Sequence, residues 1–435
     1  MKLSDIKKKI APYEIEIHFG IVQKINAANI DITGLSPSIG DIIKIVTTTT
    51  NEERLGMVVE LHKNSFSVSP FGFVEGLKIG DRAYIDEEGL AISVGEGLLG
   101  RVVNPLMAPK DSKGAIRGIS KKMPIIKAPI DAMKRGLIEE PFPVGVKTID
   151  GLLTAGVGQK VGIFAGSGVG KSTLMGMIVR GSKAPIKIVA LIGERGREVP
   201  EFIEKNLGGD LTDTVIVVAT SDDSSLMRKY GAFAAMSVAE YFKDQGRDVL
   251  FIMDSITRFA MAQREIGLSL GEPPTSKGYP PSSLTLLAQL MERAGKEEGK
   301  GSITAFFTVL IEGDDMSDPI ADQSRSILDG HIVLSREMTD FGIYPPINIL
   351  NSASRVMGDV TNKEHLESAM KFKKLYSLLK ENEVLIRIGA YTKGSDPELD
   401  EAMNKKEAMN NFLKQDPNIY EDFSQTLDKL KGLTN

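Results

Sequence analysis

The segment Ala165-Gly-Ser-Gly-Val-Gly-Lys-Ser172 has the residue types and the spacing of a loop that binds phosphate. Its glycines let the backbone curl until consecutive N–H groups point at one phosphate, and a helix that begins at Lys171 adds the positive end of its dipole. Lys171 would then reach the β- and γ-phosphates of a nucleotide, and the Ser172 hydroxyl would coordinate Mg²⁺. The usual pattern begins with glycine instead of Ala165, a difference that a residue at the end of a strand tolerates. The residues predicted to bind the nucleotide phosphates are Ala165, Gly166, Ser167, Gly168, Val169, Gly170, Lys171, Ser172 and Thr173.

Two carboxylates stand just after apolar runs of strand length. Asp254 follows the run 249–253, and Glu194 follows the run 187–192 with one glycine between. Because ligands bind at the carboxyl ends of the strands in parallel α/β sheets, both side chains are expected beside the phosphate loop. Asp254 is predicted to help hold Mg²⁺, and Glu194 is predicted to be the general base that aligns and deprotonates the attacking water. A charge cluster on the surface is the alternative interpretation of Glu194 and its neighbours.

The sequence also offers arginines that could balance phosphate charge. Arg195 follows Glu194 in the run Gly-Glu-Arg-Gly-Arg-Glu at 193–198. Residues 344–355 combine an aromatic side chain, a proline pair, a predicted strand and a turn of small residues that presents Arg355. An arginine displayed in this way can act on a neighbouring molecule as an arginine finger, which accelerates phosphoryl transfer about 10³–10⁵-fold. The spacing alone nevertheless favours a surface salt bridge for Arg355.

The elements that must position these residues follow from composition and periodicity. Short β-rich runs separated by Gly, Asn and Pro over 18–95 predict a small all-β barrel or sandwich. The six prolines of 104–145 predict a wrapped linker without long regular elements. Apolar runs of strand length, the last at 347–350, alternate with helical stretches over 150–354, which predicts a largely parallel sheet covered by helices.

Both ends of the chain are predicted to be helical. Leu3, Ile6 and Ile10 lie at helical spacing among lysines, which predicts a short amphipathic helix, although a frayed solvated end fits equally well. Helix formers dominate after residue 360, and Ser395 and Asp396 are candidate helix N-caps there. The predicted organisation is an amphipathic segment at 1–17, a β-barrel domain at 18–95, an ATPase domain with its linker at 96–360 and a helical domain at 361–435.

Composition limits the classes of function. The chain has 435 residues, more than the roughly 250–300 at which a single core stops growing, so several domains are expected. It has no cysteine, which excludes disulfides, thiol nucleophiles and cysteine-ligated metals. Neither a signal peptide nor a run of ~18–20 apolar residues is recognisable, which predicts a cytoplasmic protein that is neither exported nor integral to a membrane. A net charge of −5 gives no reason to expect binding to nucleic acid.

The chain resembles the catalytic subunits of rotary ATP synthases, and most closely the flagellar and type III secretion export ATPases. The sequence PPINILNSAS has the form of the family's signature decapeptide, and GERGREV together with IRIGAYTKGSDPE resembles the export branch, within which a flagellar member is preferred. Residues 283–288, SLTLLA, depart from the family's usual VFAKLP. The resemblance runs nearly end to end, through 95–111, 141–172, 193–204, 249–282, 318–336, 343–357 and 385–402.

This resemblance implies an α/β fold, with a RecA-like P-loop core, a small N-terminal β-barrel and a helical C-terminal domain. It implies hydrolysis of ATP with Mg²⁺ as cofactor, because non-catalytic subunits of the family replace the residue that matches Glu194. Arg195 and Arg258 match positions near the γ-phosphate, and Tyr344 matches the position whose ring packs against adenine. Arg355 matches an arginine that reaches into the site of the adjacent subunit.

The resemblance also implies partners. Since one chain carries both the glutamate and the arginine, identical copies could complete each other's sites in a homohexameric ring. The implied partners are a stator-like regulator at the N-terminus, a central stalk, export chaperones and substrates at the C-terminal domain, and a membrane export gate at the inner face of the cytoplasmic membrane. The alternatives that stay open are the same enzyme in a virulence-type secretion system, a hexameric RNA helicase, which needs a basic groove lined by aromatic side chains, and a nucleotide-binding scaffold without turnover.

Overall fold

The computed structural model describes residues 18–434 apart from 27–28, 312–314 and 316. The amphipathic helix predicted within 1–17 therefore lies outside the described residues. The described residues form two compact units, one up to Leu90 and one from Ala91 onward.

The first unit contains a closed barrel of six antiparallel strands in the order β1-β2-β5-β4-β3-β6. Alternate side chains along β1 and β2 are buried, as the period of two requires when one face of a sheet lines a core. The core side chains are Val22, Ile30, Ile32, Ile43, Ile45, Val58, Phe66, Val68, Leu77 and Ala83. The strand bounds are β1 Gly20–Ile25, β2 Ile30–Thr33, β3 Ile42–Val46, β4 Glu53–Leu61, β5 Phe66–Pro70 and β6 Arg82–Ile85.

One strand predicted for the barrel domain lies elsewhere. β7 (Ala91–Val94) pairs in antiparallel orientation with β9 (Lys121–Pro124), which belongs to the segment predicted as linker. The first compact unit accordingly ends at Leu90, not at residue 95. An alternating apolar pattern identifies a strand but not its partner, because the pairing depends on residues about thirty positions further along the chain.

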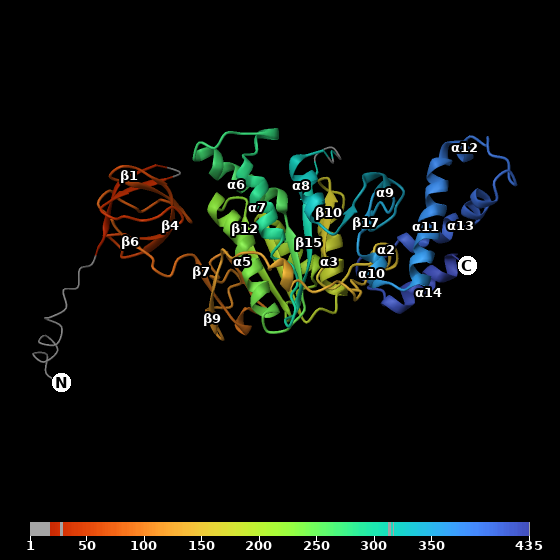
Figure 1. Ribbon diagram of the computed structural model, residues 1–435, viewed down its shortest axis with the longest axis horizontal. Helices are drawn as coiled ribbons and strands as arrows, with labels where there is room; N and C mark the ends of the chain where they lie inside the picture. The colour runs from red at the N-terminus through yellow and green to blue at the C-terminus, as the bar shows by residue number, and fades with distance from the viewer. Residues whose placement is uncertain (1–17, 27–28, 312–314, 316, 435) are drawn as a thin grey trace, which may run out of the picture. The chain divides into compact units, whose positions relative to one another are not determined.

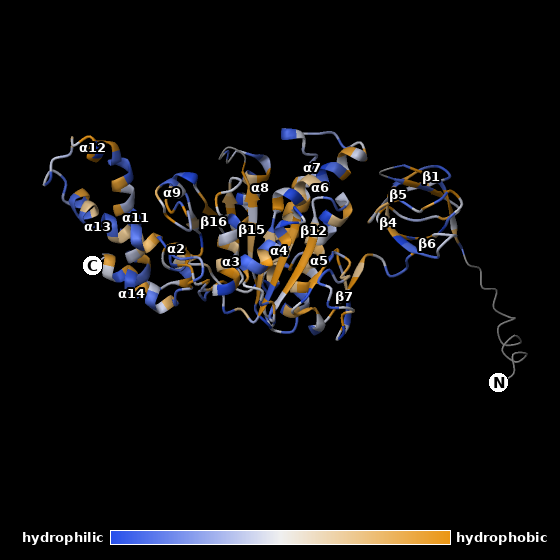
Figure 2. Cartoon of the chain, turned by 180° about the vertical axis from the view of Figure 1, so that it is seen from behind, coloured by the Kyte–Doolittle hydropathy of each residue, from blue (hydrophilic) through white to orange (hydrophobic). Residues whose placement is uncertain are grey.

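The second unit is built on a sheet in the order β17-β16-β10-β15-β13-β11-β12-β8. All neighbours on this path from β16 through to β8 pair in parallel. β17 pairs antiparallel with β16, and β14, which lies off the path, pairs antiparallel with β15. This confirms the prediction of a largely parallel sheet. β10 and β13 are buried at every position, and the strands are among the most hydrophobic segments in Figure 2. The bounds are β8 Val102–Val103, β10 Lys160–Ala165, β11 Ile186–Glu194, β12 Thr214–Thr220, β13 Val249–Asp254, β14 Gly295–Lys296, β15 Ser302–Leu310, β16 Gly330–Val333 and β17 Ala353–Ser354.

Helices follow most of these strands and run beside the sheet (Figure 1). Polar residues cap them, as Ser224 does for α5 and Ser255 for α6, each by accepting a backbone N–H three residues later. The helices are α2 Lys147–Leu152, α3 Lys171–Gly181, α4 Glu198–Glu201, α5 Ser225–Lys243, α6 Ile256–Ser269, α7 Pro281–Met291, α8 Pro319–Ile327, α9 Arg336–Asp340 and α10 Met357–Val360, with a single π-helical turn, η3, at Phe202–Asn206.

Two local features differ from or add to the sequence expectations. The strand predicted at 347–350 is wrong: only one bridge, between Leu334 and Ile347, forms there, and the short β17 follows instead. Asn348 explains this, because its side-chain Oδ1 accepts the N–H groups of Leu350 and Asn351, so the backbone turns there instead of continuing a ladder. The run 283–288, which departs from the family sequence, lies inside α7.

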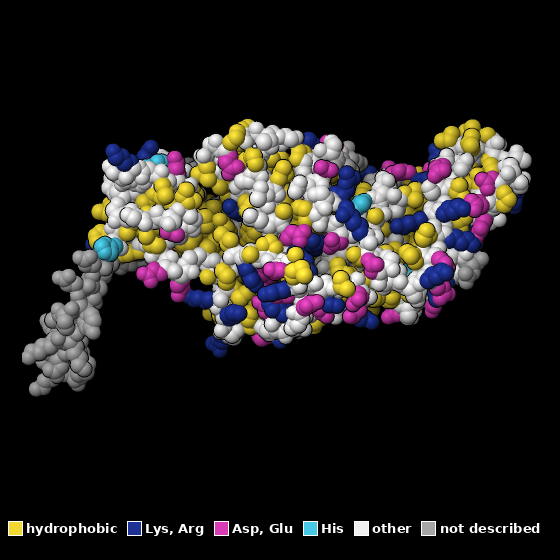
Figure 3. Space-filling view, viewed as in Figure 1, with side chains coloured by type: hydrophobic (Ala, Val, Ile, Leu, Met, Phe, Trp, Pro, Cys, Tyr) yellow, Lys and Arg dark blue, Asp and Glu magenta, His cyan; other side chains and the backbone are white. Residues whose placement is uncertain are grey.

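The C-terminal part is helical, as predicted, and comprises α11 Lys363–Glu381, α12 Glu383–Arg387, α13 Pro397–Leu413 and α14 Phe423–Thr434. Asp396 caps α13 by accepting the N–H groups of Glu398 and Leu399. The aromatic core of these helices, with Phe372 against Phe412, is continuous with the core of the sheet domain. Figure 3 shows Lys and Arg interspersed with Asp and Glu over the visible face of the second unit. Among the described residues, no helix is long and apolar enough to cross a membrane.

Candidate functional site

The phosphate loop has the strand, loop and helix that its sequence predicts. β10 ends at Ala165, and α3 begins at Lys171. Gly168 and Gly170 have φ values of 76° and 102°, in the left-handed region that favours glycine. The loop itself is exposed at Ser167 and at Ser172, so its backbone is accessible to a ligand at the N-terminus of α3.

Three side chains predicted to do chemistry meet beside this loop. The Lys171 ammonium group is hydrogen-bonded to Asp254 Oδ1 and lies 3.9 Å from Glu194 Oε1. They come together because β11 and β13 are neighbours in the sheet and both end at this edge, with Leu191 paired to Asp254. The Thr308 hydroxyl of β15 donates to the same Asp254 oxygen at 2.7 Å. The sheet order therefore places one cation and two carboxylates at the point where strand ends meet the loop.

Glu194 has the electrostatics of a base that works near neutral pH. The pKa of its carboxyl is raised to about 7, mainly by burial and also by the negative charge of Asp254, while the Lys171 charge opposes both effects. A general base is most effective when its pKa lies close to the operating pH. Strong perturbation of a carboxyl group by burial and by a specific charged neighbour is typical of catalytic sites.

Arg258 lies under the turn that precedes Glu194. The turn residue Gly193 has a φ of 76°, and a Cβ placed on it would lie 2.7 Å from Arg258 Cβ, so the arginine stem packs directly against the glycine. Ser255, the N-cap of α6, accepts the Arg258 N–H at 3.2 Å. In the described part of the chain, Arg258 Nε is buried without a hydrogen-bond partner. A buried donor of this kind is suited to an anion that arrives with the ligand.

The other two arginines do not join this cluster. Arg195 is exposed and lies 3.8 Å from Glu198 Oε1. Arg355 is also exposed and donates from Nη2 to the Arg325 carbonyl oxygen at 3.1 Å. Across residues 18–434 as far as they are described, no hydrogen bond or ion pair joins Arg355 to the carboxylates or the lysine at the loop. The structure thus leaves Arg355 outside the site of its own chain.

Tyr344 lies near the phosphate loop and is 51% exposed. Pro346, two residues on, is close to Gly170: a Cβ on that glycine would be 3.7 Å from the proline ring. The Tyr344 carbonyl oxygen accepts the backbone N–H of Gln415 at 2.7 Å. An exposed aromatic ring held beside the loop by the C-terminal helical domain is a suitable surface for a nucleotide base.

Sequence reasoning missed three residues that support the site: Thr308, Gln415 and Arg336. The sequence could have identified Thr308 as a candidate, because it is a polar residue in an otherwise apolar run. Gln415 is buried, and its side chain accepts the Lys147 N–H and donates to the Gly145 carbonyl oxygen. These contacts span about 270 positions, so no local pattern reveals them.

The donor set fits Mg²⁺. Ser172 is exposed at the start of α3, and Asp254 lies at the neighbouring strand end, so a hydroxyl and a carboxylate are available. Mg²⁺ prefers oxygen ligands and is commonly held by one or two protein groups together with substrate phosphates.

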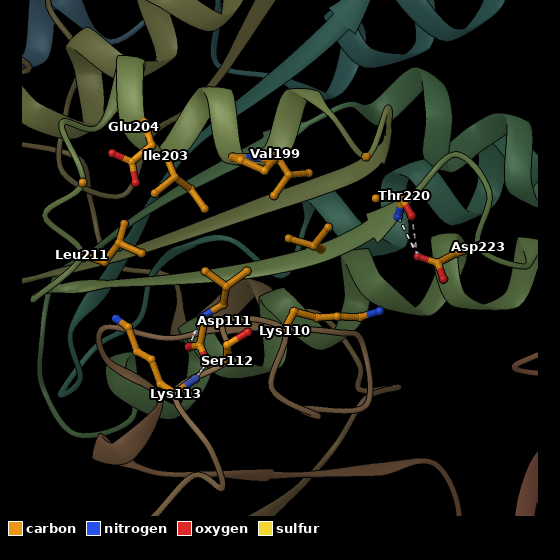
Figure 4. A pocket seen from close by; sticks show the side chains of 15 residues that line it. Lys110, Asp111, Ser112, Lys113, Val199, Ile203, Glu204, Leu211, Thr220 and Asp223 are labelled. Atoms are coloured by element: carbon orange, nitrogen blue, oxygen red, sulfur yellow. Dashed lines mark hydrogen bonds between the residues drawn. The ribbon is translucent and has the colours of Figure 1, made fainter.

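Two cavities lie near the strand ends. One, of about 430 Å³, includes Ser172 and Thr173 and extends to Pro417 and Asn418 of the C-terminal part. The other, of about 540 Å³, lies between β12 and the η3 region and contains no residue of the phosphate loop. Figure 4 shows Val199, Ile203 and Leu211 lining the latter cavity. The cavity beside Ser172 is therefore the one that a nucleotide bound at the loop can use.

Comparison with known proteins agrees with this geometry. Residues 145–354 match the model of the ATP synthase alpha/beta family, nucleotide-binding domain, and residues 361–432 match that of the T3SS EscN ATPase C-terminal domain. The flagellum-specific ATP synthase of Helicobacter pylori strain J99 is 63% identical over 434 residues, which covers all of both chains. The type 3 secretion system ATPase of Xanthomonas euvesicatoria is 43% identical and covers 99% of this chain and 97% of its own.

A solved structure extends the similarity to three dimensions. The assembled ATPase EscN from the type III secretion system of enteropathogenic E. coli superposes with a TM-score of 0.89 at 43% identity, covering 96% of this chain and 100% of that one. The same ATPase solved with its central stalk EscO gives the same TM-score at 42% identity. The chain therefore belongs to the ATP synthase alpha/beta and type III secretion ATPase family, and within it this ATP-hydrolysing enzyme groups with the flagellum-specific ATP synthases.

Proposed function

We propose that this ATPase works as a homohexameric ring that couples ATP hydrolysis to the export of flagellar proteins through the flagellar type III secretion apparatus. One observation carries the proposal. A single chain brings Lys171, Glu194 and Asp254 together at its phosphate loop and displays Arg355 away from them. Each copy would thus supply most of one site and one arginine to another.

Each residue of the cluster has a distinct role in this proposal. The loop N–H groups and Lys171 bind the phosphates of ATP, and Lys171 exchanges its contact with Asp254 for one with the γ-phosphate. Glu194 aligns a water in line with the γ-phosphate and accepts its proton. Arg258 donates to the γ-phosphate oxygens from beneath Gly193, and Arg195 stabilises the same charge from the exposed side.

Ser172 and Asp254 are the residues that would hold Mg²⁺. When bound, the ion would neutralise charge that develops on the β- and γ-phosphates. The Thr308 hydroxyl, which donates to Asp254, fixes the orientation of this carboxylate.

The remaining half of the site would come from the next copy. A head-to-tail interface closes into a ring when its rotation divides a full turn. Arg355 is exposed and is held at the end of β17 by its own N–H bond to the Asp329 carbonyl oxygen and by its side-chain bond to Arg325. This support presents the guanidinium outward, as an arginine finger in trans requires.

Assembly and location follow the same proposal. The solved relative EscN is an assembly and has a central stalk partner, which supports a ring and a stalk here. We further propose a cytoplasmic ring, bound peripherally to the cytoplasmic membrane at the export gate, which receives export chaperones and substrates at its C-terminal helices and a stator-like regulator at its N-terminus.

The proposal is tested by separating nucleotide binding from turnover. Glu194→Gln keeps the shape of the side chain but removes the base, so MgATP binding should persist while turnover falls by about 10²–10⁴-fold. Asp322→Asn, an exposed carboxylate on α8, is the matched control and should hydrolyse ATP normally. Retained turnover in Glu194→Gln would show that another group activates the water.

A further inference from the structure

Arg336 connects the phosphate loop to a short helix that is remote in sequence. Its Nη2 donates to the Ser167 carbonyl oxygen at 3.1 Å, across 169 positions of the chain. We propose that Arg336 is a positioning residue, which holds the phosphate loop in its binding conformation, and that α9 ties this contact to the C-terminal helical domain. The inference rests on the proposed role of the loop in binding the nucleotide phosphates.

The geometry of the peptide unit explains what the contact does. A trans peptide is planar, so the carbonyl of Ser167 and the N–H of Gly168 point in opposite directions. When Arg336 holds the carbonyl, the Gly168 N–H is turned away from Arg336 and kept in one orientation. Gly168 has no Cβ to restrict it and adopts a φ of 76°, so without this contact the loop has more conformations to lose on binding. Arg336 therefore lowers the entropic cost of binding phosphate.

α9 itself is held by α11 of the C-terminal helical domain. Lys380 on α11 donates to Glu337 at 2.8 Å, and its ammonium group lies 4.5 Å from the centre of the Phe341 ring. The Tyr376 hydroxyl lies 3.7 Å from Met338 Sδ. Since contacts are made at the first turn, at the middle and just after the last residue of α9, this helix should follow α11 when α11 moves. A displacement of the C-terminal helices would then withdraw or restore the arginine at the loop.

If removal of the Arg336 side chain weakens nucleotide binding, the competing explanation is that Arg336 contacts a phosphate of the nucleotide directly. A charge that acts on phosphate is screened by salt, so the ratio of variant to wild-type affinity would approach one at high ionic strength. A positioning role predicts that the ratio persists, because the order of the loop does not depend on the charge of the ligand.

The test is a series of MgADP dissociation constants on the full-length protein. Arg336→Ala should weaken binding about fivefold, which corresponds to the net contribution of one typical hydrogen bond. Lys380→Ala should weaken it about twofold. Lys374→Ala, which breaks a pair with Glu398 inside the C-terminal helices, is the matched control and should bind as the wild type does.

The double variant decides whether the two contacts are coupled. Arg336→Ala/Lys380→Ala should bind no more weakly than Arg336→Ala alone, because Lys380 acts through Arg336. Wild-type affinity in Arg336→Ala, a defect that vanishes at high salt, or fully additive effects would each overturn the inference. Lys171→Ala is measured alongside. This variant distinguishes a failure of the inference about Arg336 from a failure of the proposed phosphate site. If Lys171→Ala loses MgADP and Arg336→Ala does not, only the inference fails; if neither loses it, the proposed phosphate site is wrong.

Discussion

Gly193 is the position at which a single methyl group should disable the enzyme. The residue has a φ of 76°, which costs an alanine about 1–2 kcal/mol. The added Cβ would also lie 2.7 Å from Arg258 Cβ and 3.0 Å from its Cγ, so the arginine or the turn has to shift. Overpacking of this kind costs about 1–3 kcal/mol, which gives a total of about 2–5 kcal/mol for Gly193→Ala.

The effect on turnover should exceed the effect on stability. Gly193 is covalently joined to Glu194 and packs on Arg258, so a shift displaces the proposed base and a proposed phosphate ligand together. A displacement of about 1 Å at reacting groups costs about 10²-fold in rate. We therefore expect kcat for ATP hydrolysis to fall about 10²-fold in Gly193→Ala, with the protein still folded at 25 °C.

The same loop supplies the control. Gly196 has open space where a Cβ would be and does not have a positive φ, so Gly196→Ala should retain wild-type turnover and unfolding temperature. The two variants are compared by steady-state ATP hydrolysis per folded protein and by thermal unfolding. Wild-type kcat in Gly193→Ala, or an equal loss in Gly196→Ala, would refute the reasoning from backbone geometry.

Two further predictions concern the carboxylates. The pKa of Glu194 is raised to about 7, above its usual value of 4.5, so below pH 7 the carboxyl holds a proton and cannot accept another. We expect kcat/KM to rise about tenfold per pH unit below this pKa and to level off above it; a flat profile from pH 5.5 to 8 would contradict the assignment. Thr308→Val removes the donor to the buried Asp254 at nearly constant shape, so the free energy of unfolding should fall by about 1.5–3 kcal/mol and turnover should fall with it. An unchanged unfolding temperature at pH 7.5 would show that this hydrogen bond contributes nothing.

Much of the fold and part of the candidate site could be predicted from local sequence patterns. The glycine spacing and the apolar runs that end on Asp254 and Glu194 are properties of short segments, and a parallel sheet brings such strand ends to one edge. The antiparallel barrel and the C-terminal helices likewise follow from periodicities of two and 3.6 residues.

Contacts between distant segments could not be predicted in this way. The pairing of β7 with β9 and the hydrogen bonds of Gln415 and Arg336 depend on which surfaces meet after folding. The strand predicted at 347–350 was wrong: Ile347 and Ile349 are buried, but backbone pairing there is limited to the bridge of Ile347 with Leu334, and Leu350 is exposed. Tertiary context overrides local propensity at such positions.

The central claim, that each site is shared by two copies, is tested most directly by mixing two inactive variants. Lys171→Ala lacks the lysine proposed to bind phosphate, and Arg355→Ala lacks the proposed finger, so rings of either alone should be nearly inactive. In rings co-assembled from equal amounts, about a quarter of the interfaces join an intact loop to an intact arginine. We predict that ATP hydrolysis recovers to a measurable fraction of the wild-type rate on mixing. Verified mixed rings without any recovery would contradict the shared site.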